Sequence, residues 1–209
     1  MWTRCKNRNI RISPGFLLLI GMLLYLDDGT GLFPWAVGAA VLHELGHIAA
    51  AMLFHGRLDA LTLSAVGAEL RFSYAAPLTY GKESLVALAG PATNLLAGLT
   101  ALRLGAYPQA AVNLGLGLFN LLPILPLDGG RVLSNLVSEY FDPMVANRVL
   151  AVTAGVLIGL LAGFGTVFAL EYANAMPLIL ALWLLLGAVR RENGPGRGEP
   201  GKKSSQNQK

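Results

Sequence analysis

The sequence has one cysteine, Cys5, among 209 residues, and only 13% of its residues are charged. A single cysteine excludes an intrachain disulfide and a zinc site built from several thiolates. Soluble domains usually carry about a quarter charged residues. The low charge, the 54% of hydrophobic residues and several apolar runs of about twenty residues therefore indicate an integral membrane protein. We do not interpret the formal net charge of +4 as a sign of nucleic-acid binding.

Apolar runs predict an all-α membrane protein with about six transmembrane helices, in one compact domain over residues 1–190. The runs cover residues 16–26, 32–54, 84–102, 109–127, 149–170 and 176–189. The fourth run ends in NLLPILPLDGGRVL, where two prolines and two glycines should break the helix. The Gly-, Pro- and Lys-rich tail, residues 191–209, is expected to be disordered.

A segment with a different period lies between the second and third spans. From Asp59 to Tyr74, apolar residues alternate with polar ones on both sides of Gly67. A period of two is typical of strands. We therefore expect a small β-hairpin at the membrane surface.

The basic residues predict the orientation of the chain. With six spans, both termini lie on one side of the membrane, and 15 of the 16 Lys and Arg residues fall on that side. Only Arg103 lies opposite. The positive-inside rule then makes both termini, and the hairpin, cytoplasmic in a multi-pass protein of the cell membrane.

The second span carries the motif HELGH, residues 43–47. His43 and His47 are four residues apart, so both imidazoles lie on one face of a helix and can bind one zinc ion. Glu44 is then placed to take a proton from water. Polar groups within a span are costly and usually mark a site. The alternative is a polar cluster that only holds helices together.

A catalytic zinc usually has three protein ligands and an open position, so a third ligand must come from elsewhere. His55 lies too far along the predicted helix to share the ion, and we expect it to be interfacial. Asp128 follows the apolar letters LLPILPL and lies close to hydrocarbon. Irregular backbone at that depth is tolerated only in protein or beside a wet cavity. Its predicted depth matches that of the histidines, although it could instead cap a turn before Arg131.

HELGH, then GPATN (residues 90–94), then FNLLPILPLDGG (residues 119–130) resemble the motifs of the site-2 proteases, which are intramembrane zinc metalloproteases. The resemblance covers residues 32–133. It implies that His43, His47 and Asp128 hold one Zn²⁺ and that Glu44 is the general base. It also implies that Asn94 helps to hold the substrate strand. Asn120 is a second candidate for positioning substrate, or an interhelical hydrogen-bonding residue.

Within this family the chain looks most like the short sporulation type, stage IV FB, which releases a sigma factor from its pro-form. No insert of PDZ type separates HELGH from DGG. The resemblance implies a membrane-associated protein substrate and small membrane-protein inhibitors as partners. Sporulation-type members commonly carry a C-terminal nucleotide-binding CBS domain, which this sequence does not show. A site-2 protease of a stress or envelope signalling pathway is an alternative.

Two other classes of function fit less well. A divalent-metal transporter usually shows internal repeats and polar groups along a whole path, whereas the fifth and sixth spans are almost wholly apolar. An inactive binding protein would not need Glu44, because metal binding alone does not use that residue.

Overall fold

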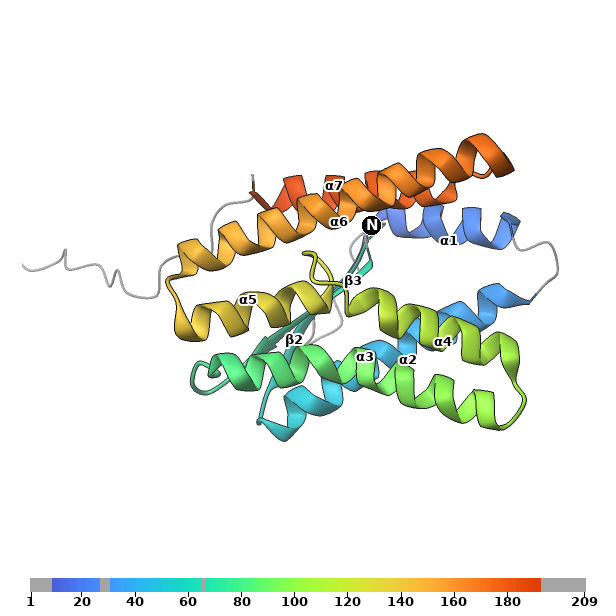
Figure 1. Ribbon diagram of the computed structural model, residues 1–209. Helices are drawn as coiled ribbons and strands as arrows, with labels where there is room; N and C mark the ends of the chain where they lie inside the picture. The colour runs from blue at the N-terminus through green and yellow to red at the C-terminus, as the bar shows by residue number, and fades with distance from the viewer. Residues whose placement is uncertain (1–8, 27–30, 65–66, 193–209) are drawn as a thin grey trace, which may run out of the picture.

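The computed structural model describes residues 9–26, 31–64 and 67–192, so most of the predicted disordered tail lies outside it. Figure 1 shows helices that run side by side, with α6 and α7 along one side, α2, α3 and α4 on the other, and α5 between them. The elements are β1 (Asn9–Ile12), α1 (Pro14–Leu26), α2 (Leu32–Leu53), β2 (Arg57–Ser64), β3 (Gly67–Ser73), α3 (Tyr80–Arg103), α4 (Tyr107–Asn120), α5 (Asp128–Tyr140), α6 (Pro143–Tyr172) and α7 (Met176–Glu192).

Each predicted span coincides with a helix, but the helices differ in length. Among the described residues, three are long and apolar enough to cross a membrane: Leu32–Leu53, Tyr80–Arg103 and Met144–Tyr172. Met176–Val189 is a shorter apolar helix, and α1 and α4 have only 13 and 14 residues. The chain thus has the helices of a membrane protein, while the number of six spans remains a prediction.

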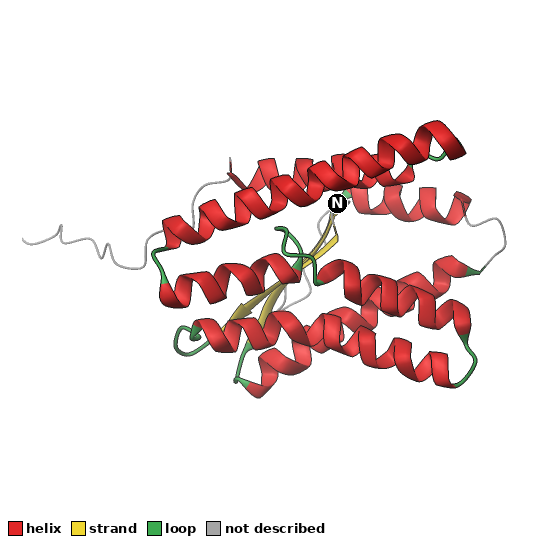
Figure 2. Cartoon of the chain, viewed as in Figure 1, coloured by secondary structure: helices red, strands yellow, loops and turns green. Residues whose placement is uncertain are grey.

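The fourth predicted span is shorter than expected. Helix α4 ends at Asn120, and the turn of residues 121–127 follows, with a cis peptide bond between Leu125 and Pro126. Figure 2 shows this turn as a loop between α4 and α5. The predicted break is confirmed, but the expectation of irregular backbone at Asp128 was wrong, because Asp128 is the first residue of α5.

Two glycines allow the turn to fold back on the start of α5. A Cβ atom at Gly129 would collide with the carbonyl of Leu121. A Cβ atom at Gly130 would lie 2.6 Å from the backbone nitrogen of Leu125. The letters DGG are therefore needed for packing, since any side chain at these two positions would push the turn away from Asp128.

The predicted hairpin is confirmed as β2 and β3, which pair antiparallel with Leu61 opposite Leu70. Gly67 begins β3, and residues 65–66 lie outside the described chain. The sequence did not predict β1, which pairs parallel with β2 and places Ile10 opposite Leu61. In the order β1-β2-β3, β2 is the central strand. Within the described residues, β3 therefore has one unpaired edge.

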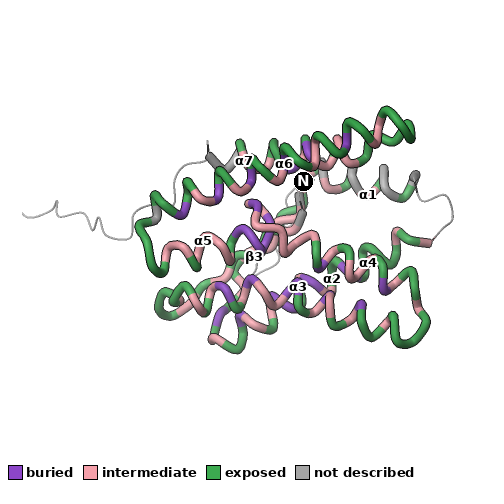
Figure 3. The backbone as a smooth tube through the Cα atoms, viewed as in Figure 1, coloured by how far each residue is buried: buried purple, intermediate pink, exposed green. Residues whose placement is uncertain are grey.

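The α6–α7 pair packs on the turn between α4 and α5. Ile124 and Leu127 from the turn are almost fully buried, at 1% and 5% exposure. They form one apolar cluster with α6 and α7 residues, namely Ala154, Ile158, Ala181 and Leu184. The buried positions in Figure 3 gather there and around the middle of α2 and α3. Apolar contact thus holds the turn in place one residue before Asp128.

Candidate metal centre

Helix α2 presents two imidazoles side by side. His43 and His47 are each 6% exposed, and their ring planes stand 85° apart. Their Nε2 atoms lie 3.1 Å from one another. The spacing of four residues therefore does what the sequence predicts, because it directs both side chains to one point.

The first residue of α5 brings a carboxylate to the same point. Asp128 Oδ2 lies 3.0 Å from His43 Nε2 and 3.2 Å from His47 Nε2. Its other oxygen, Oδ1, lies 3.8 Å from the guanidinium of Arg131, one helical turn further along α5. The structure thus brings together the three predicted ligands, although His43 and Asp128 are 85 residues apart in the sequence.

Outer hydrogen bonds determine which imidazole nitrogens carry protons. His47 Nδ1 lies 2.8 Å from the carbonyl oxygen of Val86. A carbonyl only accepts, so in the neutral imidazole this nitrogen carries the proton and Nε2 keeps a lone pair. His43 Nδ1 lies 2.7 Å from Asn94 Oδ1, and the same reasoning applies. Both Nε2 atoms therefore face the carboxylate as acceptors.

This set of donor atoms fits a zinc ion. Two bare nitrogens and a carboxylate oxygen lie 3.0–3.2 Å apart, with no proton left to link all three. In tetrahedral zinc with ligand bonds of about 2.05 Å, ligand atoms are about 3.3 Å apart. A cation at the centre would turn the repulsion between these lone pairs into attraction. The His43, His47 and Asp128 cluster could therefore hold one Zn²⁺.

The remaining predicted site residues lie at different distances from the ligands. Glu44 follows His43 on α2 and is half-buried. Asn94 is fully buried and contacts His43, so it lies directly behind a ligand. Asn120 donates to the carbonyl of Leu116 in its own helix. Among the described contacts, none joins Asn120 to the ligands, and the substrate-positioning roles of Asn94 and Asn120 remain predictions.

Glycines allow α3 to approach the face of α2 that carries His43 and His47. A Cβ atom at Gly46 would lie 2.6 Å from Thr93 Oγ1 and 2.7 Å from the carbonyl oxygen of Ala89. A Cβ atom at Gly90 would lie 2.6 Å from His47 Cε1 and still closer to Nε2. Gly90 therefore packs directly against the ring of His47.

Three supporting groups were not found from the sequence. They are the carbonyl of Val86, the close contact at Gly46, and Asn113, which lies behind Asn94. Backbone carbonyls leave no trace in a sequence. Asn113 did offer a signal, because it is a polar residue among Leu and Gly in a predicted span.

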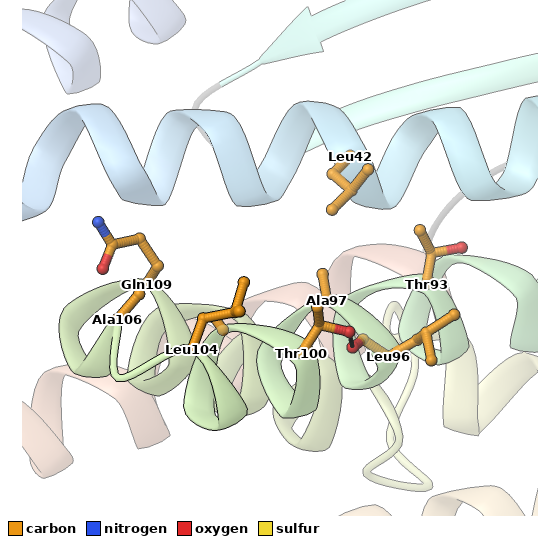
Figure 4. A pocket seen from close by; sticks show the side chains of 9 residues that line it. Leu42, Thr93, Leu96, Ala97, Thr100, Leu104, Ala106 and Gln109 are labelled. Atoms are coloured by element: carbon orange, nitrogen blue, oxygen red, sulfur yellow. Dashed lines mark hydrogen bonds between the residues drawn. The ribbon is translucent and has the colours of Figure 1, made fainter.

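An open apolar groove of about 500 Å³ lies between α2 and α3, away from the ligands. In Figure 4, Leu42 of α2 faces Thr93 and Ala97 of α3, and Gln109 lies at the other end. Its lining contains none of the three ligands. We therefore place the chemistry at the buried cluster and not in this groove.

Comparison with known proteins supports this assignment. Residues 106–164, which include Asp128, match the model of peptidase family M50. The chain also resembles the solved site-2 protease from Methanocaldococcus jannaschii, with a TM-score of 0.67 and 22% identity over 90% of this chain and 92% of that one. Part of the chain is thus similar to peptidase family M50, and its fold is similar to that of a solved site-2 protease.

Curated relatives match most of the chain. The zinc metalloprotease MJ0392 of Methanocaldococcus jannaschii is 25% identical over 86% of this chain and 56% of its own length. The putative zinc metalloprotease sll0528 of Synechocystis is 30% identical over 86% and 58%. Stage IV sporulation protein FB of Bacillus subtilis is 29% identical over 84% and 62%. The chain thus spans little more than half the length of these relatives.

Proposed function

We propose that this chain is an intramembrane zinc metalloprotease, which hydrolyses a peptide bond in or near a transmembrane segment. The observation that carries the proposal is the meeting of His43, His47 and Asp128 at one buried point. Two of these ligands and Glu44 lie on α2, a helix that is long and apolar enough to cross a membrane. Metallopeptidase relatives support the same chemistry.

The residues divide the work of hydrolysis. A zinc ion held by the three ligands would supply a Lewis acid and make water easier to deprotonate. Glu44 takes the proton from the attacking water and delivers it to the leaving amine. Asn94 and the carbonyl of Val86 hold the imidazoles in the tautomer that binds metal. Asp128 contributes a negative charge, so the centre is less positive than it would be with three imidazoles.

The substrate class follows from where this chemistry lies. A buried site within apolar helices meets membrane-associated proteins, so we propose that cleavage releases a regulatory protein from the membrane. A pro-sigma factor of sporulation is one such substrate, supported by the likeness to the sporulation protein FB. The other relatives are about as similar to this chain as the sporulation protein is. A role in stress or envelope signalling is therefore the alternative. Small membrane-protein inhibitors, cytoplasmic termini and one membrane domain over residues 1–190 belong to the same proposal.

Chelation is the direct test of the proposed activity. Purified full chain in detergent micelles, mixed with a single-span membrane protein carrying a cleavable reporter, should give two fragments. Treatment with 1,10-phenanthroline should abolish cleavage, and added Zn²⁺ should restore it, because hydrolysis needs the ion. Cleavage that persists in metal-free protein would contradict the proposal.

The unpaired edge of β3 offers a place for an unwound substrate. A helical peptide hides its carbonyls in hydrogen bonds, so it must become extended before hydrolysis, and an extended strand can pair with a free sheet edge. Leu70→Pro removes one backbone N–H from β3 and should lower cleavage about tenfold with zinc content unchanged. Gel-based cleavage assays and zinc analysis of the same preparation measure both quantities.

Neighbouring positions provide the control for this substitution. In an antiparallel pair, successive residues alternate between facing the partner strand and facing away. Leu70 and Arg71 are neighbours on β3, so the backbone N–H of one of them faces β2 and that of the other faces the free edge. Proline at the first position weakens the pairing of β3 with β2, and proline at the second removes a donor from the free edge alone. Full cleavage by both proline variants would show that the edge does not bind substrate.

A further inference from the structure

We propose that Asn113 of α4 is a positioning residue of the metal centre. It acts through Asn94, and Asn94 acts through His43. The inference rests on the proposed zinc site and adds to it a group from a helix that contributes none of the ligands. Four residues form this Asn113 chain: Gln109 by its backbone carbonyl, Asn113, Asn94 and His43.

The orientation of the Asn94 amide is fixed by a backbone group. Asn94 Nδ2 lies 2.9 Å from the carbonyl oxygen of Ala39, one helical turn before His43. A carbonyl accepts only, so the amide nitrogen must face it and the amide oxygen must face His43 Nδ1. The reversed amide would place its nitrogen against His43 and favour the proton on Nε2. His43 would then lose the lone pair that faces Asp128.

A second backbone carbonyl fixes Asn113 in the same way. Asn113 Nδ2 donates to the carbonyl oxygen of Gln109 at 2.9 Å. Its Oδ1 therefore accepts from Asn94 Nδ2, also at 2.9 Å. Asn94 thus donates both amide protons, one to Ala39 and one to Asn113, while its oxygen accepts from His43. Because Asn94 is fully buried, the loss of either acceptor leaves an N–H without a partner in a dry environment.

Close packing of α3 on α4 brings the short side chain of Asn113 within hydrogen-bonding distance of Asn94. A Cβ atom at Gly98 would lie 2.7 Å from Leu114 Cγ, next to Asn113 in sequence. A Cβ atom at Gly117 would lie 3.1 Å from Leu95 and from the carbonyl of Pro91. The two glycines stand on either side of the contact between Asn94 and Asn113. The interface is therefore narrow where the amides meet.

A different role for Asn113 would be to hold α3 and α4 together without affecting the metal. The two roles differ in what they change. An interhelical hydrogen bond alone alters the stability of the metal-free protein and leaves the coordination unchanged. A positioning residue alters the affinity for Zn²⁺ and the visible absorption of bound Co²⁺, because both report the orientation of His43.

The test uses the full chain in detergent micelles with Asn113→Leu, which keeps the size and removes the acceptor. Competition with a chromogenic chelator should show Zn²⁺ affinity reduced about threefold to tenfold, less than the 10- to 100-fold typical of a direct outer partner. The Co²⁺ absorption band should shift. Thr153→Val is the matched control, since Thr153 also donates to a carbonyl four residues earlier but lies in α6. It should bind Zn²⁺ as wild type does.

Asn94→Leu separates direct from indirect action. In that background Asn113→Leu should cause no further loss of Zn²⁺ affinity, because the residue through which it acts is gone. Asn113→Asp keeps the shape and an acceptor oxygen, and it should bind Zn²⁺ more tightly than Asn113→Leu. Wild-type affinity and an unchanged Co²⁺ band in Asn113→Leu, or equal losses in the leucine and aspartate variants, would overturn the inference alone. A wild-type chain that binds no Zn²⁺ would overturn the proposed function as well.

Discussion

Glu44→Gln is expected to abolish cleavage while zinc stays bound. The amide has nearly the shape of the carboxylate but cannot take a proton from water. General bases typically contribute about 10²- to 10⁴-fold to a rate, and the loss should lie in that range. Glu44 is not one of the three clustered ligands, so zinc content by atomic absorption should match that of wild type. Fragment yield from a co-expressed single-span substrate measures the activity.

Glu139→Gln is the matched control for this result. It makes the same chemical change on an exposed face of α5, and cleavage should continue at the wild-type rate. Substantial cleavage by the Glu44→Gln protein would mean that another group activates the water. Loss of zinc from this variant would mean that Glu44 is a ligand and not a base.

Gly90→Ala is expected to weaken zinc binding by about 10- to 100-fold or more. Removing an outer hydrogen-bond partner of a ligand typically lowers metal affinity by that factor, and displacing the ligand itself should lower the affinity no less. The added methyl would meet the ring of His47 at Cε1, Cδ2 and Nε2. The neighbour here is a ring held by the carbonyl of Val86, so it cannot turn aside without losing that bond. Titration with a chromogenic chelator measures the affinity, and cleavage should fall with it.

The same helix provides the control. Gly81 lies in the first turn of α3, and a Cβ atom there meets nothing within 4 Å. Gly81→Ala should therefore leave zinc affinity and cleavage unchanged. Wild-type affinity in Gly90→Ala would show that His47 has room to move, and that the tight contact has no functional consequence.

Much of the site could be predicted because its signals are local or chemically unusual. The four-residue spacing of His43 and His47 needs only a helix to direct both rings to one face. Asp128 stands out as an acid beside a long apolar run. Asn113 and Gly90 support the ligands through tertiary contacts, so their partners cannot be found from spacing alone.

In the fold, too, features that arise within one element were predicted, and features that depend on tertiary contacts were not. Hydrophobic runs located the helices and alternation located the β2–β3 hairpin, since both patterns arise within one element. Strand β1 has four residues, and its pairing with β2 joins segments far apart in the sequence. Helix α5 was missed as a helix because the prolines before it and the glycines in its first turn indicate a break. They do not show that a helix begins again at Asp128.

The turn between α4 and α5 has a mechanical consequence for the metal centre. Ile124 and Leu127 are fixed against α6 and α7, and the next residue, Asp128, is a candidate ligand. The histidines are held from the opposite side by α3. The two halves of the helix bundle thus meet at the candidate zinc site, and a change in their separation would change the distance between Asp128 and the two histidines. A movement of the α6–α7 pair relative to α2 and α3 would therefore be passed on to Asp128 through Ile124 and Leu127.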